Sequence, residues 1–187
     1  MPLRNLPDFA VYLAAGAVAG LLSAVVAIDS VGSEPAAPGS IWLSHSAATR
    51  APANPYALAH YLLQGRFPSS TNQTHEFLAD RDGDGNRIHA DCTYAITGTP
   101  DPAHWWNLSG GSGDGGPVPH STFLTSSDAV LNSDGTLTAT LSRLPRPGNW
   151  IRPQASGRFS LIYTVAGFAA ATGAAVIPPF SIKQTGC

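Results

Sequence analysis

The stretch GRFSLIYTV, residues 157–165, carries large apolar or aromatic side chains at Phe159, Leu161, Tyr163 and Val165. This spacing of two residues is the period of a β-strand, in which successive side chains point to opposite faces of a sheet. The same alternation, or a shorter form of it, predicts further strands at 76–79, 92–97, 104–108, 122–125, 137–141 and 180–183. The sequence therefore predicts a mainly β fold, either an antiparallel β-sandwich or a jelly-roll-like pair of sheets.

One short helix is predicted upstream of these strands. Asn54 is typical of an N-cap, Pro55 of the first helical position, and Gly65 of a helix end. Leu58, Tyr61 and Leu62 fall on one face, so the helix is expected to be amphipathic. Elsewhere the 19 glycines and 16 prolines favour turns between short strands over long soluble helices.

The N-terminal part of the chain has a different character. Residues 9–28, FAVYLAAGAVAGLLSAVVAI, contain no charge, and about 20 residues at about 1.5 Å each span a hydrocarbon core of about 30 Å. We therefore expect a cytoplasmic stub at 1–8, a transmembrane helix at 9–28, a flexible linker at 29–40, and a β-rich extracytoplasmic domain at 41–187.

Two interpretations of the apolar segment remain open. Arg4 on the near side and Asp29 on the far side favour a cytoplasmic N-terminus and a single-pass anchor in a bacterial inner membrane. A cleaved signal peptide is the alternative, with Val25 and Ala27 at the small-residue positions before a cut. The uncharged run is longer than the roughly 7 to 15 residues of a usual signal core, which favours the anchor.

The charge balance limits the classes of partner. The formal net charge is -2 and only 12% of the residues are charged, so the chain has no basic field to attract phosphates. Nucleic acid is therefore excluded as an expected partner. The lipid bilayer is the partner expected for residues 9–28.

Several motifs resemble a known family. They are DCTYAITGTPDPAHWWNLS (91–109), DGTLTATL (134–141), GNWIRP (148–153), GRFSLIYTV (157–165) and IPPFSIKQTGC (177–187). Together with NPYALAHYLLQG (54–65), they resemble the bacterial domain-of-unknown-function family numbered 1214. The resemblance implies a β-sandwich-like fold, an N-terminal membrane segment in short members, and no assigned activity. Leu161 and Asn107 depart from it, because the family usually has arginine and serine there.

An acidic run is the first candidate site. Asp80, Asp82, Asp84 and Asp91 follow the spacing of a calcium-binding loop of the EF-hand kind. The last of them is aspartate where the loop needs the longer glutamate, and Arg87 places a positive charge among them. A hairpin turn rich in Asp and Gly is the alternative explanation of the same residues.

Aromatic residues form the second candidate site. The neighbours Trp105 and Trp106 on one strand must face opposite sides of the sheet, so that one can fill the core while the other meets solvent or a ligand. Asn149 and Trp150 follow a Pro-Gly turn and are read either as part of this ligand site or as a hydrogen-bonded corner. Core packing is the alternative for all three tryptophans.

The two cysteines are the third feature of interest, as a candidate disulfide. Cys92 and Cys187 are the only two in the chain, and a bridge between them would tie the C-terminal strand to the sheet. Two free thiols are the alternative. The six histidines show no spacing typical of a zinc site.

These observations lead to two hypotheses from different classes. The first is an extracytoplasmic binding or structural module of the bacterial envelope, which meets a carbohydrate or an envelope protein through exposed aromatics. The second is a hydrolase or lyase that acts on carbohydrate in a cleft between the sheets, which would place His104, Asp91 or Glu76 beside an exposed tryptophan. A calcium-stabilised spacer is a third reading of the acidic run.

Overall fold

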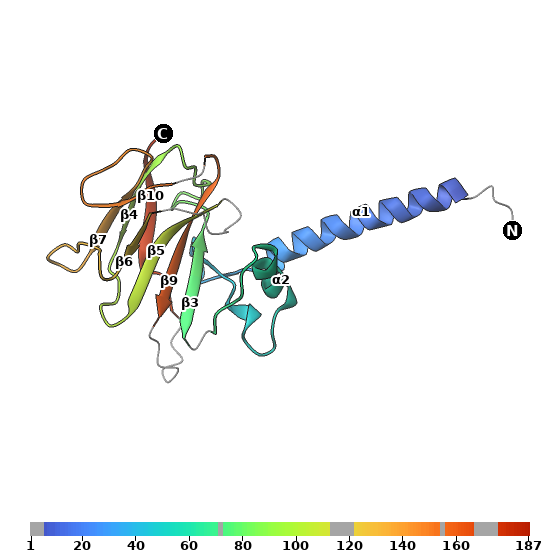
Figure 1. Ribbon diagram of the computed structural model, residues 1–187, viewed down its shortest axis with the longest axis horizontal. Helices are drawn as coiled ribbons and strands as arrows, with labels where there is room; N and C mark the ends of the chain where they lie inside the picture. Colours follow the sequence, from blue (N-terminus) through green and yellow to red (C-terminus); the bar gives the residue numbers. More distant parts are fainter. Residues whose placement is uncertain (1–5, 71–72, 113–121, 154–155, 167–175) are drawn as a thin grey trace.

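A computed structural model describes residues 6–70, 73–112, 122–153, 156–166 and 176–187 of the chain. An isolated helical rod, α1 (Leu6–Val31), projects from a domain built of two facing sheets (Figure 1). Its apolar span, Phe9–Val31, has no buried residue within its most apolar part. Arg4, on which the expected orientation depends, and residues 1–3 and 5 of the expected stub lie outside the described residues.

The remaining elements follow one another as β1 (Glu34–Pro35), β2 (Leu43–Ser44), the 3-10 helix η2 (Ser46–Ala48), α2 (Pro55–Leu63), β3 (Thr74–Ala79), β4 (Thr93–Gly98), β5 (Trp105–Ser112), β6 (Phe123–Thr125), β7 (Leu137–Leu141), β8 (Asn149–Ile151), β9 (Phe159–Ala166) and β10 (Phe180–Gly186). All the strands predicted from the sequence are present within a few residues of their expected bounds. The strands β1, β2 and β8 were not predicted.

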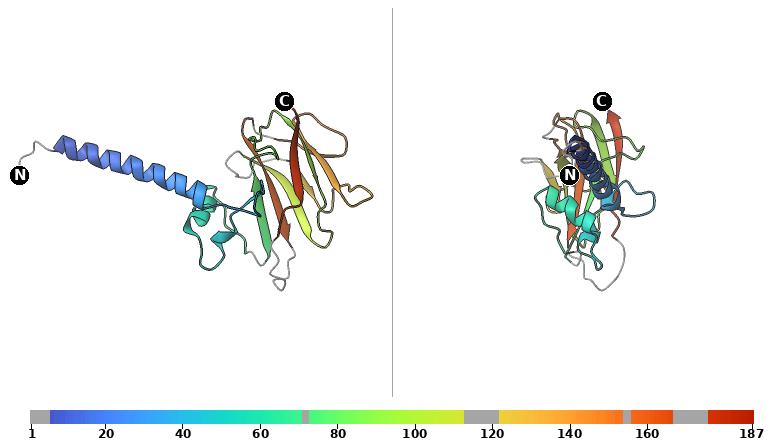
Figure 2. Two further views of the ribbon diagram at one scale, coloured as in Figure 1. Left: turned by 180° about the vertical axis from the view of Figure 1, so that it is seen from behind. Right: turned by 90° about the vertical axis from the view of Figure 1, so that its right-hand side faces the viewer.

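The strands form a six-stranded sheet, in the order β1-β2-β3-β9-β5-β6, and a four-stranded sheet, in the order β10-β4-β7-β8. Every pair is antiparallel except β7 with β8, which is parallel. Figures 1 and 2 show the two sheets stacked face to face. The mainly β, sandwich-like fold expected from the sequence is therefore confirmed.

The core between the sheets is rich in aromatic side chains. The Tyr163 ring lies edge-on to Phe180, with centroids 5.2 Å apart, and edge-on to Trp42 at 6.2 Å. Phe180 also meets Trp106 at 5.9 Å. The Trp42 indole nitrogen donates to the Phe180 carbonyl oxygen over 2.7 Å, and Trp42 is only 2% exposed. These contacts join the segment before β2 to the last strand of the chain.

The predicted linker 29–40 departs from its expected flexibility. The helix α1 continues to Val31, and Glu34 and Pro35 then pair with β2 at the edge of the six-stranded sheet. The Ala36 amide donates to the Trp42 carbonyl over 2.8 Å. A segment without an apolar period thus becomes ordered through backbone hydrogen bonds, which its side-chain pattern does not reveal.

The predicted bounds and cap of the 54–65 helix are confirmed, but only Tyr61 of the predicted face is buried. The Asn54 side chain accepts from the Tyr56 and Ala57 amides and caps α2. The buried residues are Ala57 and Tyr61, which pack on Ala47 and Ala48 of η2. Leu58 and Leu62 are exposed, because the contacts of α2 with η2 and with the end of α1 do not cover them.

Candidate functional site

The two neighbouring tryptophans of β5 divide between core and surface, as the sequence predicted. Trp106 is 2% exposed and lies in the aromatic core, whereas Trp105 is 46% exposed. Trp105 pairs with Ala166 of β9 at the start of the strand. One indole is therefore free for contact with a partner, and the other is a packing residue.

A second exposed aromatic lies on the same face of the six-stranded sheet. Phe123 of β6 is 59% exposed and pairs with Ser109 of β5. Ser109 lies four residues beyond Trp105 on β5, and both face outward because side chains alternate. At about 3.3 Å per residue, the two aromatics stand roughly 13 Å apart along the strand direction.

Polar residues lie between these two aromatics. Asn107 pairs with Thr125 on one side and with Thr164 on the other, which gives a row of amide and hydroxyl groups across three strands. The Asn107 side-chain oxygen is buried and has no hydrogen-bond partner among the described residues, and the Thr125 hydroxyl donates to the Asp128 carboxylate over 2.6 Å. Aromatic rings flanking amides and hydroxyls suit a ligand with flat apolar faces and polar edges, such as a sugar.

Asn149 and Trp150 form a hydrogen-bonded corner in the other sheet. The Asn149 amide oxygen accepts from the Val130 amide over 2.8 Å, and its nitrogen donates to the Val130 and Thr138 carbonyls over 2.7 and 3.0 Å. The Trp150 indole donates to the Ser142 carbonyl over 2.9 Å. The hydrogen-bonding groups of both side chains are engaged within the fold, and the structure does not bring these two residues to Trp105.

The acidic run forms a tight hairpin turn between Arg81 and Arg87, whose backbones form an antiparallel bridge. Asp82 is fully buried, and one of its carboxylate oxygens accepts from the Asp84 and Asn86 amides over 3.1 and 2.8 Å. Gly85 has φ of +84°, which only glycine adopts freely. The turn chemistry accounts for Asp82 and Gly85 at these positions.

The four aspartates are not gathered around one point. Asp80 pairs with Arg87 and, at 4.0 Å, with Arg81. Asp91 pairs with Arg143 at 2.7 Å. Within the described part of the chain, no group of three or more His, Cys, Asp or Glu side chains is placed to hold a metal ion.

Two substitutions distinguish a turn from a calcium loop. We expect Asp82→Ala to lower the free energy of unfolding by about 1 to 3 kcal/mol, since it removes the buried acceptor of two amides. Asp84→Ala should change it by less than about 0.5 kcal/mol, because that side chain is exposed. Urea unfolding of both variants, with added calcium and with chelator, measures this. Equal losses in both variants that appear only when calcium is present would instead support the loop.

The predicted disulfide is confirmed. Cys92 and Cys187 are bonded across a sequence separation of 95 residues. The bond fastens the end of β10, an edge strand, to the residue that precedes β4. Its role is structural, and it leaves no free cysteine in the chain.

The three groups whose clustering would favour an enzyme lie apart. Glu76 of β3 forms a two-point ion pair with Arg66, Asp91 pairs with Arg143, and His104 pairs with Asp101 at 3.0 Å. Each is engaged with a different partner. The structure therefore does not assemble the acid and base that the hydrolase or lyase hypothesis needs from these residues.

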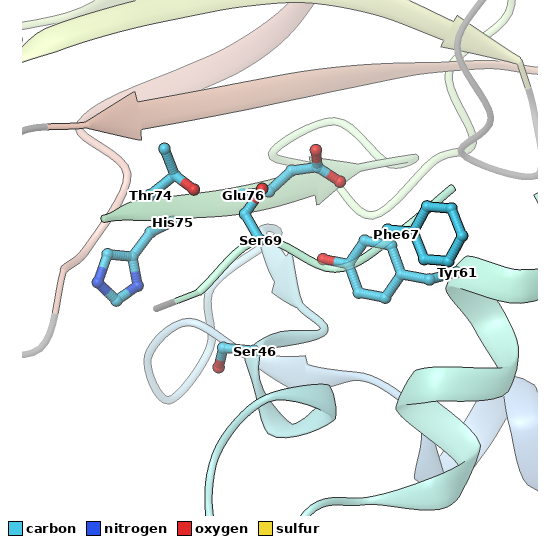
Figure 3. Close-up of a pocket in the computed structure, with 7 residues that line it drawn as sticks. All are labelled: Ser46, Tyr61, Phe67, Ser69, Thr74, His75 and Glu76. Carbon is cyan, nitrogen blue, oxygen red and sulfur yellow. The ribbon is translucent and has the colours of Figure 1, made fainter. Parts of the chain in front are cut away.

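A small pocket lies between α2 and the first residues of β3 (Figure 3). It is lined by Ser46, Tyr61, Phe67, Ser69, Thr74, His75 and Glu76. Its volume is about 20 Å³, which is room for about one water molecule. Figure 3 shows Tyr61 reaching from α2 toward the strand that carries Glu76.

The charged and aromatic side chains around this pocket bind one another and stabilise the packing of α2 near β3. The Arg66 guanidinium lies 5.8 Å from the centroid of the Tyr61 ring while it pairs with Glu76. Burial, followed by the charge of Glu76, raises the pKa of Tyr61 to about 12. Tyr61 therefore stays protonated at neutral pH. The ion pair between Arg66 and Glu76 joins the segment that follows α2 to β3.

A larger cavity, of about 410 Å³, lies where α1 meets the domain. Its lining contains Asp29, Ser33, Leu43, His45, His60, Leu78, Asp80, Arg81, Arg87 and Arg158. The His45 and His60 rings are stacked with centroids 3.7 Å apart. Burial, then the neighbouring charges of His60 and Arg66, lower the pKa of His45 to about 3, so this ring is neutral at neutral pH. No sequence motif predicts this pair.

Taken together, the fold and its surfaces define a two-sheet β-sandwich domain carried by an N-terminal apolar helix. The chain belongs to the family described as "Protein of unknown function (DUF1214)", whose model matches residues 73–167. The family resemblance seen in the sequence is thus confirmed. No curated protein matches the chain.

Two solved structures share parts of this architecture. The VPA0106 protein from Vibrio parahaemolyticus is 15% identical, with a TM-score of 0.53 over 71% of this chain and 36% of its own. An uncharacterised protein from Burkholderia cenocepacia is 18% identical, with a TM-score of 0.44 over 63% of this chain and 30% of its own. The chain thus matches about a third of the length of each, and the likeness to the Vibrio protein concerns the fold alone.

Location follows from two features of the chain. The N-terminal helix is apolar enough to serve as a signal or an anchor and could contact a membrane. Disulfides form and persist outside the reducing cytoplasm, and this chain contains one. The helix and the disulfide together suggest an extracytoplasmic location.

Proposed function

We propose that this protein is a binding module of the bacterial envelope, anchored in the inner membrane by residues 9–28 and displaying residues 41–187 outside the cytoplasm. Residues 1–8 then lie in the cytoplasm, and residues 29–40 join the anchor to the domain. We further propose that the module binds a glycan polymer on the outer face of its six-stranded sheet.

The observation that carries the glycan proposal is the exposure of Trp105 and Phe123 on one face of that sheet. Large aromatic side chains are unfavourable in contact with water. A partner that covers them gains the free energy of burying their apolar surface. The polar residues Asn107 and Thr164 lie between them on neighbouring strands. A polymer of linked sugars repeats flat apolar ring faces and polar hydroxyl edges along its length.

The full-length chain in detergent should sediment with purified peptidoglycan sacculi, which are a glycan polymer of the proposed compartment. Trp105→Ala should weaken this binding by about tenfold or more, because truncating a tryptophan at a binding centre commonly costs about 2 kcal/mol. Trp105→Phe should retain part of the affinity, since a ring remains. Sedimentation assays over a range of sacculus concentrations measure the change, with insoluble chitin and cellulose in parallel.

Leu144→Ala is the matched control, because Leu144 is an exposed apolar residue in the connection between β7 and β8. It should bind as the unmodified chain does. Failure of all three polymers to bind, or equal binding by the Trp105→Ala and Leu144→Ala variants, would rule out the glycan proposal.

A further inference from the structure

The last two residues of helix α2 are exposed leucines. Another face of the helix is packed on η2, where Ala57 is fully buried and Tyr61 is 6% exposed. Leu62 is 56% exposed and Leu63 is 75% exposed at the C-terminal end of the same helix. Exposure of this much apolar surface is unfavourable in water, by about 25 cal/mol for each Å².

The end of α2 lies beside the last turns of the apolar helix. Val25 and Ile28 of α1 and Leu63 of α2 line one cavity of about 280 Å³, together with Asp29, His60 and Gln64. Figures 1 and 2 show α2 next to the end of α1 that enters the domain. Leu63 is therefore level with residues that belong to the apolar segment itself.

This arrangement is held by specific contacts. The Asn54 side chain, which caps α2, donates to the Val31 carbonyl at the end of α1 over 2.8 Å. Gly32 lies so close to α2 that an added Cβ would be 3.0 Å from the Tyr56 carbonyl group. Backbone and cap together fix the height of α2 relative to α1.

The membrane span sets the depth of these residues. If residues 9–28 fill a hydrocarbon core of about 30 Å, Ile28 lies at its outer boundary and Val25 about 4.5 Å deeper, at about 1.5 Å per residue. Leu63, at the same level, then lies at the boundary between lipid headgroups and acyl chains. Interfacial helices insert their apolar faces about 5 to 10 Å into this region.

We propose that α2 is an interfacial helix, whose Leu62 and Leu63 are immersed in the outer leaflet of the bilayer and hold the β-domain at a fixed height on the membrane. This inference rests on the proposed function, because it takes residues 9–28 to span the bilayer. The partner is the lipid surface, since the exposed leucines continue the apolar surface of the anchor itself.

The test uses the full-length chain in vesicles of phosphatidylethanolamine and phosphatidylglycerol. Because Cys92 and Cys187 are bonded to each other, a cysteine introduced by Leu63→Cys is the single free thiol and can carry an environment-sensitive fluorophore. A nitroxide placed near the top of the lipid acyl chain should reduce its fluorescence about twofold or more, as expected for a residue at the headgroup boundary. Leu62→Cys provides a second labelled site on the same turn.

Two further labelled variants make the outcome decisive. Leu144→Cys is the matched control, because Leu144 is 71% exposed and the connection between β7 and β8 lies on the side remote from α1 (Figure 1). It should not be quenched. Val18→Cys, within the apolar segment, should be quenched most strongly by a nitroxide near the end of the acyl chain.

Each result decides between the two proposals. Quenching at Val18 without quenching at Leu63 and Leu62 would overturn the interfacial helix and leave the anchor intact. Absence of quenching at Val18 would overturn the anchor. A blue-shifted emission from the fluorophore at position 63 that lipid nitroxides do not quench would indicate a protein partner. This result would also overturn the proposed interfacial helix.

Discussion

The Cys187→Ser variant is expected to unfold with a free energy about 4 kcal/mol lower than the unmodified chain. In the chain-entropy model, a cross-link that closes a loop of this length restricts the unfolded ensemble by about that amount. The bond also fastens β10, an edge strand whose Phe180 and Ile182 are buried in the core. Urea unfolding of the full-length protein in detergent, followed by tryptophan fluorescence, measures the difference.

Reductant provides the control for this result. It should lower the stability of the unmodified chain to that of Cys187→Ser, and it should leave the variant unchanged. An unfolding midpoint that is insensitive to reductant in the unmodified chain would contradict a stabilising role of the bond.

The second large effect is expected at Trp42. Trp42→Ala should lower the free energy of unfolding by about 3 to 5 kcal/mol, as large-to-small changes at buried aromatics do. The residue packs against Tyr163 and donates to the Phe180 carbonyl, so its loss leaves both a cavity and an unpaired acceptor. Trp42→Phe keeps most of the volume and should cost about 1 to 3 kcal/mol, because only the indole N–H donor is lost and the Phe180 carbonyl is left unpaired.

Trp105→Ala is the matched control for Trp42, since it removes the same side chain from an exposed position. It should change stability by less than about 0.5 kcal/mol. Equal losses at Trp42 and Trp105 would show that the two indoles are not divided between core and surface as described here. The control also links the two experiments, because the variant that weakens glycan binding must remain folded.

The long strands could be predicted from the sequence because their largest side chains recur with a period of two, although in β9 Ser160 and Ile162 on the other face are buried as well. In β9, paired on both sides, and in β4, alternate residues such as Leu161 and Ile96 are fully buried. The split between Trp105 and Trp106 follows from the same geometry. The cap of α2 could be predicted because Asn54 and Pro55 act locally, through the backbone next to them.

Other elements could not be predicted because tertiary contacts determine them. The strands β1 and β2 have two residues each, which is too short for any period. The strand β8 pairs in parallel with β7 after a turn, and Trp42 is a lone aromatic whose partners lie far along the chain. The packing face of α2 could not be predicted, because contacts with η2 and with the end of α1 determine it and the hydrophobicity of the helix does not reveal them.

In the candidate site too, some residues could be predicted from the sequence and others depend on tertiary contacts. Trp105 could be found from the sequence, because two adjacent tryptophans on a strand cannot both be buried in one face. Phe123 lay within a predicted strand, but the sequence did not indicate its place in the site. Its pairing with Ser109 puts it on the same face of the sheet as Trp105. The acidic spacing resembled a calcium loop because Asp and Gly serve tight turns as well as metal ligation.

We propose that the apolar helix is retained on the chain and holds the oxidised β-domain outside the cytoplasm. The most direct measurement fractionates cells that express the full-length protein and treats each fraction with a thiol-reactive polymer, before and after reduction. We expect full-size protein in membranes washed with alkaline carbonate, with both thiols reacting only after reduction. Full-length protein in the soluble cytosolic fraction, with both thiols reactive from the start, would contradict it.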